Sequence, residues 1–414
     1  MHRGLSLDGF RDSREARPVS RSAGGSPSGP PLFCDKKEGV RGLPGQVQGG
    51  SPARVAKFLA KSIALVAIAV CPVGGTRAQA ADYFAGKTIT AIVGVVPGGS
   101  IEAFIRLVIG SFQKHIPGRP NIIVQNMPGA GGLLATNYLA ERARPDGLSF
   151  FWGAWDPLAQ ALDNPSLRVR YDKLDFLGGI GDVRILYART DTVPGGITKP
   201  TDIMKAERVI VGAPSATEWT GLLSVQAVDV LGLKQKIISG YRGGTDVFLA
   251  LQRGEVQFHN TSIASYNTRV VPLIKAGSMA ALAYLVPVAA DGRFTRNDTL
   301  PGVLAFPDLY HEIHGRAPSG PAWDALNWLG EQTGEMAYVG FLPPGTPAHI
   351  TATLREAFVK AFHEPEFVAQ STAQNGVPYR IVTVAHGDAT IRALAGVAPA
   401  VLANLREKMD QIGR

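Results

Sequence analysis

Two glycine-rich turns offer backbone chemistry that suits a small anion. The first turn consists of Pro97, Gly98, Gly99 and Ser100, and the second turn consists of Gly129, Ala130, Gly131 and Gly132. Each turn stands between an apolar, strand-like run and a helix-like run, and a helix start carries unpaired N–H groups and partial positive charge. Because glycine lets an anion approach those N–H groups closely, the two turns together predict a carboxylate site that needs almost no charged side chain.

Patterns for other chemistry each fail at a required residue. Ser100 stands where a phosphate-binding P-loop needs lysine, and Leu134 stands where a dinucleotide fingerprint needs its third glycine. His311 and His314 have the wrong spacing for a zinc motif, and we expect them in a surface loop. No Gly-x-Ser-x-Gly elbow occurs. The sequence therefore predicts no catalytic residue, no metal and no cofactor.

Four side chains near predicted strand ends and helix starts have two interpretations each. Trp155 either packs in the core or hinge, or forms a wall of a ligand cleft, as does Trp219. Glu218 is favoured at a helix start by the macrodipole, or it accepts a hydrogen bond from a ligand ammonium or hydroxyl group. Tyr241 packs in the core or donates its hydroxyl into the cleft.

The first eighty residues have the character of a leader. Residues 1–53 are rich in Arg, Ser, Gly and Pro without apolar periodicity, which predicts a disordered leader and suggests that Met1 is a mis-assigned start. Residues 54–80 combine basic residues, a short apolar run and Ala-x-Ala, which is typical of a signal peptide cleaved after Ala80. A lipid anchor on Cys71 is the alternative.

The charge and the cysteines belong mostly to this leader. Residues 1–80 hold 12 Lys+Arg and 5 Asp+Glu, which is +7 of the total net charge of +8. The rest of the chain is close to neutral, so the basic composition does not indicate a nucleic-acid partner. Both cysteines, Cys34 and Cys71, also lie in the leader. The mature chain is therefore expected to fold without disulfides, by the size of its core alone.

From residue 87 onwards strand-like and helix-like segments alternate, which predicts an α/β fold with mainly parallel sheets flanked by helices. The expected strands are 87–95, 121–125, 148–152, 176–188, 208–212, 236–241, 255–259, 280–286 and 337–342. The expected helices are 101–115, 133–143, 156–162, 199–206, 219–231, 245–253, 262–276, 348–363 and 366–374. The stretch 311–336 is expected to be an elaborated surface loop.

Two extended segments, 176–189 and 338–342, are predicted to cross between domains. Domain 1 would then be discontinuous, covering 82–180 plus 339–414, and domain 2 would cover 181–338. Two such domains joined by two crossing strands form a hinged, two-domain clamp. The ligand is expected in the cleft between them.

Short motifs along 82–414 resemble those of a known family, the periplasmic solute receptors of tripartite tricarboxylate transporters, called the Bug family. The motifs are 83–89, 97–102, 126–132, 145–147, 241–244 and 342–347. The most specific is Asn-Met-Pro-Gly-Ala-Gly-Gly at 126–132. Glu102 departs from the family's aspartate after the first turn.

The resemblance implies a two-domain clamp of the type II-like periplasmic-binding-protein fold. Such a receptor in the periplasm catches a small organic acid and presents it to a membrane permease. It implies that backbone amides around Gly98, Gly99, Ser100, Gly131 and Gly132 hold a carboxylate. In domain 2 it implies contacts from a helix-start loop that includes Ser215, Thr217 and Glu218, and from a strand-end loop near Thr261. The acid is expected to be a mono-, di- or tricarboxylate or an amino acid.

Two other functions stay open at this point. A sensor subunit would use the same clamp to feed a signalling partner. A secreted acid–base enzyme would use Glu102, Glu218 or Asp246, although the eight histidines are scattered without an obvious nucleophile partner.

Overall fold

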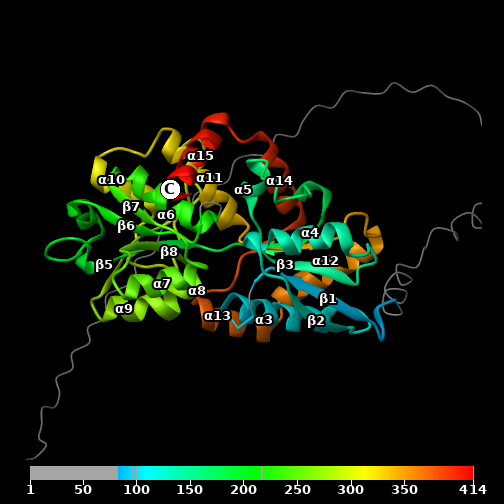
Figure 1. Cartoon of the computed structure of the whole chain (residues 1–414). Helices are drawn as coiled ribbons and strands as arrows, with labels where there is room; N and C mark the ends of the chain where they lie inside the picture. The colour runs from blue at the N-terminus through cyan, green and yellow to red at the C-terminus, as the bar shows by residue number, and fades with distance from the viewer. Residues whose placement is uncertain (1–82, 96, 99, 216–217, 414) are drawn as a thin grey trace, which may run out of the picture. The chain divides into compact units, whose positions relative to one another are not determined.

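The computed structural model describes residues 83–95, 97–98, 100–215 and 218–413, with backbone alone for Ser100, Ile101, Gln374 and Asn375. The predictions for segments 1–53 and 54–80 lie outside the described residues, as do those for Gly99 and Thr217. Within the described part, two β-sheets with helices on their faces form the framework (Figure 1). These sheets confirm the predicted α/β class.

The first sheet has six strands in the order β11-β4-β10-β3-β1-β2. Its strands are β1 (Thr88–Val93), β2 (Asn121–Asn126), β3 (Ser149–Ala154), β4 (Asp175–Ile180), β10 (Tyr338–Leu342) and β11 (Ile381–Val382). Strand β1 pairs in parallel with β2 and β3, whereas β10 runs antiparallel to β3 and β4, and β11 antiparallel to β4. The carboxyl ends of β1, β2 and β3 therefore meet at one edge of this sheet.

The second sheet has five strands in the order β7-β6-β8-β5-β9. Its strands are β5 (Arg184–Arg189), β6 (Val209–Gly212), β7 (Gln235–Ile238), β8 (Phe258–Ser262) and β9 (Met279–Tyr284). Strand β6 is parallel to β7 and β8, and β5 is antiparallel to β8 and β9. The carboxyl ends of β6, β7 and β8 therefore meet at one edge of this sheet as well.

Both sheets are mixed, so the expectation of mainly parallel pairing needs correction. The reversed strands in the sheet interiors are β5 and β10, which belong to the two segments predicted to cross. The segment expected as one strand over 176–188 is two strands, since β4 belongs to the first sheet and β5 to the second. Apolar patterning reports burial but not strand direction, and for this reason the sequence could not reveal the reversal.

Helices cover both faces of the first sheet. They are α3 (Ser100–His115), α12 (Ala348–Phe362), α13 (Pro365–Asn375), α4 (Leu133–Arg142), α5 (Pro157–Ala161) and α14 (Val384–Ala393), with short 3₁₀ turns at Ala130–Gly132, Tyr171–Lys173 and Leu394–Gly396. Helix α3 shows why such segments form helices: its buried side chains recur every three or four residues and pack against α12. They are Phe104, Ile105, Val108, Ile109 and Phe112.

The second sheet has a helical layer on each face. One layer contains α6 (Trp219–Val230), α10 (Phe306–His314), α11 (Pro321–Glu335), α15 (Pro399–Gly413) and the 3₁₀ helix Pro200–Lys205. The other contains α7 (Gly244–Gln252), α8 (Ile263–Ser265), a π-helical turn (Tyr266–Val270) and α9 (Val271–Lys275). Helix α15 lies at the C-terminus, yet its Val401, Leu405 and Ile412 belong to the core of this second sheet.

The predicted surface loop over 311–336 is wrong, because this stretch contains the end of α10 and all of α11. Pro307 in the first turn of α10 and Gly315 in a left-handed C-cap delimit the first helix, and Pro321 opens the second. Leu326 and Leu329 of α11 are fully buried against the second sheet's core. Apolar burial thus outweighed the loop-like Gly and Pro content of the segment.

Other boundaries moved by a few residues. The strand expected at 255–259 is β8, which runs over Phe258–Ser262 instead. Strand β11 and helices α14 and α15 had no sequence prediction at all. In the described part of the chain, no helix is both long and apolar enough to cross a bilayer.

The packing of α14 on β4 can be tested at Gly387. A Cβ atom there would lie 2.1–2.8 Å from ring atoms of Phe176, which is buried in β4. We expect Gly387→Ala to lower the free energy of unfolding by about 1–3 kcal/mol through overpacking, measured by urea denaturation. Gly396→Ala, where a Cβ meets nothing within 4 Å, is the matched control. Equal stability of the two variants would contradict this packing.

Candidate ligand-binding site

The end of β1, which leads into the first glycine turn, packs directly against the second glycine turn. A Cβ atom on Gly94, the residue after β1, would lie only 2.8 Å from Cα of Gly132. The side-chain amide of Asn126 donates to the carbonyl of Val95 at 3.0 Å, and the N–H of Met127 donates to the carbonyl of Val93 at 2.8 Å. The structure therefore places the residues that lead into the first turn against the second turn.

The second turn has a backbone that glycine makes accessible. Ala130, Gly131 and Gly132 have φ values of 48°, 64° and 96°, which is a run of left-handed residues. The N–H of Gly132 bonds back to the carbonyl of Gly129 at 3.0 Å, so Ala130 and Gly131 precede the first internal bond of this helix start. Gly129, Ala130 and Gly131 are exposed, so their amides can meet a ligand from solvent.

The first turn has an acid of its own close by. The N–H of Gly98 donates to Oε2 of Glu102 at 3.5 Å, which is longer than the usual N–H···O distance of about 2.7–3.2 Å. The other carboxylate oxygen of Glu102 accepts a hydrogen bond from Nε of Arg106, one helical turn later. Pro97 and Gly98 are exposed. Glu102 therefore occupies the Gly98 amide only weakly.

Trp155 and Asp156 follow β3 and lie next to the second turn. A Cβ on Gly132 would come within 3.5 Å of the carbonyl oxygen of Ala154. Trp155 is only 3% exposed and packs edge-on against Tyr171 at 5.4 Å, which is the core-packing interpretation of this residue. Asp156 caps α5 by accepting from the N–H of Ala159 at 3.2 Å.

The pKa of Asp156 is raised to about 7, mainly by burial and also by the nearby Glu218 carboxylate. Hydrogen bonds from backbone N–H groups of α5 oppose this increase. Glu218 stands at the N-cap of α6, at the carboxyl edge of the second sheet. Burial raises the pKa of Glu218 too, while the Thr220 hydroxyl, which donates to it at 2.8 Å, and Arg184 oppose the increase. The Glu218 carboxyl at the edge of the second sheet therefore contributes to the raised pKa of Asp156 after the first sheet's β3.

Arg184 begins β5, at the junction of the two sheets, and its side chain is only 11% exposed. Its Nε and Nη2 donate to Oδ1 of Asn260 at 3.0 and 2.7 Å, and its guanidinium lies 5.2 Å from the ring centroid of Trp219. Nη1 lies 3.6 Å from Oδ2 of Asp182. The cation is thus fixed in position by an amide, an aromatic ring and a more distant carboxylate.

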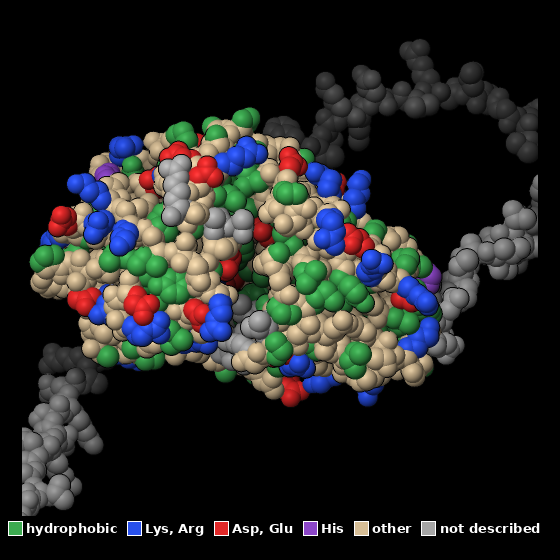
Figure 2. Space-filling view, viewed as in Figure 1, with side chains coloured by type: hydrophobic (Ala, Val, Ile, Leu, Met, Phe, Trp, Pro, Cys, Tyr) green, Lys and Arg blue, Asp and Glu red, His purple; other side chains and the backbone are tan. Residues whose placement is uncertain are grey.

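A cavity of about 200 Å³ lies between elements of both sheets, and we call it the inter-sheet cavity. Phe104 of α3, Tyr338 of β10 and Tyr379 provide aromatic surface, whereas the residues after β8 provide hydroxyl groups. The complete lining is Ala103, Phe104, Asp182, Ser262, Ala264, Ser265, Thr268, Arg269, Tyr338 and Tyr379. The space-filling view shows the described face hollowed near its middle, with acidic side chains on the walls (Figure 2).

The remaining predicted site residues lie at varying distances from this cavity. Thr261 pairs with Ile185 in the sheet, and the next residue, Ser262, lines the cavity. Ser215 is exposed, and its carbonyl accepts from the N–H of Glu218 at 3.4 Å. Tyr241 is outside the cavity lining; its hydroxyl donates to Glu255 at 3.5 Å, and its ring packs on the second sheet's core.

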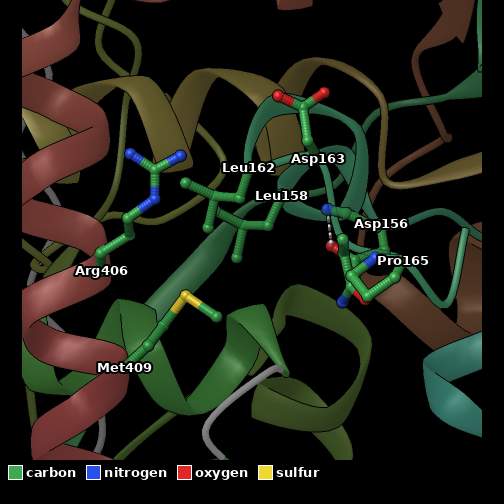
Figure 3. A pocket seen from close by; sticks show the side chains of 9 residues that line it. Asp156, Leu158, Leu162, Asp163, Pro165, Arg406 and Met409 are labelled. Atoms are coloured by element: carbon green, nitrogen blue, oxygen red, sulfur yellow. Dashed lines mark hydrogen bonds between the residues drawn. The ribbon is translucent and has the colours of Figure 1, made fainter.

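A second cavity, of about 210 Å³, lies between α5 and α15 (Figure 3). Leu158, Leu162 and Met409 give it an apolar wall, and Arg406 reaches toward it from α15. The buried carboxyl of Asp156 lines this cavity as well. The negative charge of Glu218 also contributes to its raised pKa.

Two further observations limit the chemistry that these residues can perform. Burial lowers the pKa of His259 to about 3, helped by Arg184, so this histidine is neutral and cannot serve as a cation near pH 7. In the described part of the chain, no group of three or more His, Cys, Asp or Glu side chains could hold a metal ion.

Sequence reasoning missed Asp156, Asp182, Arg184 and Arg269. Arg184 and Asp182 did carry a signal, because charged residues inside an apolar strand-like run are rarely buried without partners. Asp156 had the signal of an acid between a strand and a proline-led helix. Arg269 had none, since its position in the cavity depends on how the helix after β8 is wound.

No protein-family model and no curated protein sequence matches the chain. Solved structures do match. The chain is 18% identical to the periplasmic binding protein BugD, with a TM-score of 0.56, over 78% of this chain and 97% of that chain.

Two further structures resemble the chain in the same way. MatC from Rhodopseudomonas palustris, solved with malate, is 19% identical with a TM-score of 0.53, over 79% of this chain and 99% of that one. An R. palustris protein solved with adipate is 16% identical with a TM-score of 0.56, over 79% and 97%. The chain therefore shares the fold of these proteins across nearly their whole length.

The pKa of Asp156 predicts a pH dependence of stability. Its value rises from 3.8 to about 7 on folding, so the folded state holds the proton more tightly than the unfolded state. Stability due to this group is present below about pH 4 and is lost as the pH rises toward 7. At about 1.4 kcal/mol per pKa unit the loss reaches about 4 kcal/mol at most.

Asp156→Asn keeps an N-cap acceptor but cannot ionise, so it should flatten this decline. Urea unfolding of both proteins at pH 4.5, 6 and 8 measures the difference. Asp163→Asn, which removes an exposed acid from the wall of the same cavity, is the control. Parallel pH profiles for the wild type and Asp156→Asn would contradict the prediction.

Proposed function

We propose that this protein is a periplasmic solute-binding receptor that captures a small carboxylate-bearing molecule and delivers it to a tripartite tricarboxylate transporter permease. The Bug-like motifs support the family, and the fold shared with BugD supports a binding protein rather than an enzyme. The neighbours solved with malate and adipate make small organic acids the first ligands to test.

The contact of Gly94 with Gly132 is the observation that carries this proposal. It holds the end of β1, which leads into the first turn, against the second turn at one edge of the first sheet, and Gly98, Ala130 and Gly131 are exposed there. Several N–H groups aimed at one carboxylate give charge-assisted hydrogen bonds, each worth roughly 1.5–3 kcal/mol. A ligand carboxylate at normal bonding distance would displace the 3.5 Å contact of Glu102 from Gly98.

We propose that binding closes a two-domain clamp. Domain 1 would comprise 82–180 plus 339–414 and domain 2 would comprise 181–338, with the ligand between them. The separate sheets support this division. Helix α15 departs from it, because its packing on α6 and α11 argues that this helix moves with domain 2 rather than with domain 1. Closure would be driven by contacts that the ligand makes with both domains.

We propose export through a signal peptide at 54–80, followed by release into the periplasm. The function needs no catalytic residue. The three acids considered for acid–base chemistry have separate partners, because Glu102 pairs with Arg106, Asp246 with Arg242, and Glu218 with Thr220. Binding of an acid without its conversion is therefore expected.

An acid and its amide should separate in a binding assay. We expect a small carboxylic acid to raise the melting temperature and to bind with one-to-one stoichiometry, because only the carboxylate accepts several charge-assisted bonds. The corresponding amide should have little effect. Calorimetry and thermal unfolding with paired acids and amides, preceded by native mass spectrometry of co-purified ligand, make the measurement. Equal shifts for both members of each pair would refute the carboxylate site.

Gly94→Ala should weaken acid binding by displacing the second turn from the first. The added Cβ would be 2.8 Å from Gly132 Cα, so the backbone of one turn must move. We expect affinity to fall at least about tenfold, since misplacing one strong hydrogen bond costs about 1.4 kcal/mol or more. Gly110→Ala on α3, where a Cβ meets nothing within 4 Å, should leave affinity unchanged. Unaltered binding by a folded Gly94→Ala protein would count against the paired turns.

A further inference from the structure

Arg269 lies at the wall of the inter-sheet cavity that faces the start of α3. It belongs to the second sheet's side, seven residues after β8 ends, together with the cavity residues Ser262, Ser265 and Thr268. Across the cavity stand Ala103 and Phe104, in the first turns of the helix that begins at the first glycine turn. A ligand held at that turn can therefore extend toward Arg269.

The guanidinium of Arg269 has no carboxylate partner among the described residues. Its nearest contacts are weak: Nη1 donates to the hydroxyl of Thr245 at 3.4 Å, and the group lies 5.9 Å from the ring centroid of Phe248. The residue is half-buried. Most other arginines near the second sheet have a carboxylate within 4 Å, including Arg184, Arg189 and Arg242.

The one acid that lines the same cavity is already engaged. Oδ1 of Asp182 accepts from the N–H groups of Val183 and Ile263 at 2.8 and 3.3 Å, and Oδ2 faces Nη1 of Arg184 at 3.6 Å. Arg184 thus balances the charge of Asp182. The positive charge of Arg269 remains without a counter-ion in the cavity lining.

The helix that carries Arg269 is wound irregularly at this position. Residues Tyr266–Val270 form a π-helical turn between α8 and α9. Such turns widen the helix and redirect its side chains, and they occur frequently at functional sites. The π turn contains both Thr268 and Arg269, the two cavity residues that lie beyond the first turn of the helix.

We propose that Arg269 binds a second anionic group of the ligand, at the end away from the glycine turns, with Ser262, Ser265 and Thr268 as neutral donors. This inference rests on the proposed function and names the residue that selects among acids. The planar fork of arginine suits a carboxylate in two-point contact, and the partly desolvated cavity strengthens that contact.

A cationic group of a ligand could instead bind near two buried acids. Asp156 and Glu218 lie where β3 and β6 lead into α5 and α6, and a ligand ammonium group there would make an amino acid the better ligand. The inter-sheet cavity contains Arg269 and hydroxyl groups instead, which favours a second anion. An amino-acid ligand is accordingly an outcome that overturns the proposal.

The test compares acids that differ only in their second charged group. Saturated α,ω-dicarboxylates of three to eight carbons, monocarboxylates of equal length and the matching ω-amino acids are titrated into the wild type by calorimetry. We expect at least one diacid to bind tenfold or more tightly than its monoacid. Arg269→Gln should weaken that diacid by about 10- to 100-fold and change the monoacid less than about twofold.

Two variants keep the result specific. Arg269→Lys retains the charge but loses the fork, so its diacid affinity should be intermediate. Arg242→Gln removes an exposed arginine of the same sheet's loops, paired with Asp246, and should leave all affinities unchanged. Thermal unfolding of the ligand-free variants checks that each one folds.

The outcomes separate this inference from the proposed function. If monoacids bind better than their amides but no diacid gains affinity, or if Arg269→Gln weakens both series equally, the role of Arg269 is refuted while the receptor stands. A preference for the ω-amino acid over the diacid also refutes it. If no acid binds better than its amide, the carboxylate receptor itself fails.

Discussion

The close approach of Gly94 to Gly132 is the constraint on which the candidate site depends. A side chain at Gly94 would push the second turn away by its backbone, and this would separate the two turns that we propose to hold one carboxylate. Asn126 supports the same arrangement by bonding across to Val95. The candidate site therefore depends on the absence of a side chain at Gly94, because a Cβ atom there would push the second turn away from the end of β1.

Charged side chains at the junction of the two sheets, above all Arg184 and Asp182, are held in fixed positions. Arg184 is held by Asn260 and Trp219 and balances Asp182, which in turn accepts backbone N–H groups at the end of β4 and the start of α8. A buried ion pair adds little net stability, but its geometry is expensive to disturb. The arrangement therefore leaves one side of the junction with Arg269, which has no carboxylate partner among the described residues, and the other side with Asp156 and Glu218.

Much of the framework could be predicted because its signals are local. The apolar runs that became β1, β2 and β3 and the glycine turns after β1 and β2 depend on neighbours in the sequence, and they were found within a few residues. Helices α10 and α11 were missed because their Gly and Pro residues resemble a loop until the buried face of Leu326 and Leu329 is known. The reversed directions of β5 and β10 have no local signal at all.

Residue types and their spacing were enough to predict the glycine turns and the alternation of strands and helices. They also give the near neutrality of the chain after its first eighty residues. Those properties follow from residue type and spacing, which act over a few positions. Which groups meet depends on the tertiary structure, because Gly94 and Gly132, and likewise Arg184 and Asn260, are far apart in the chain. The same holds for Phe104 and Arg269, which line one cavity. Their proximity depends on sheet order and on the winding of one helix, and neither is encoded in a short stretch of sequence.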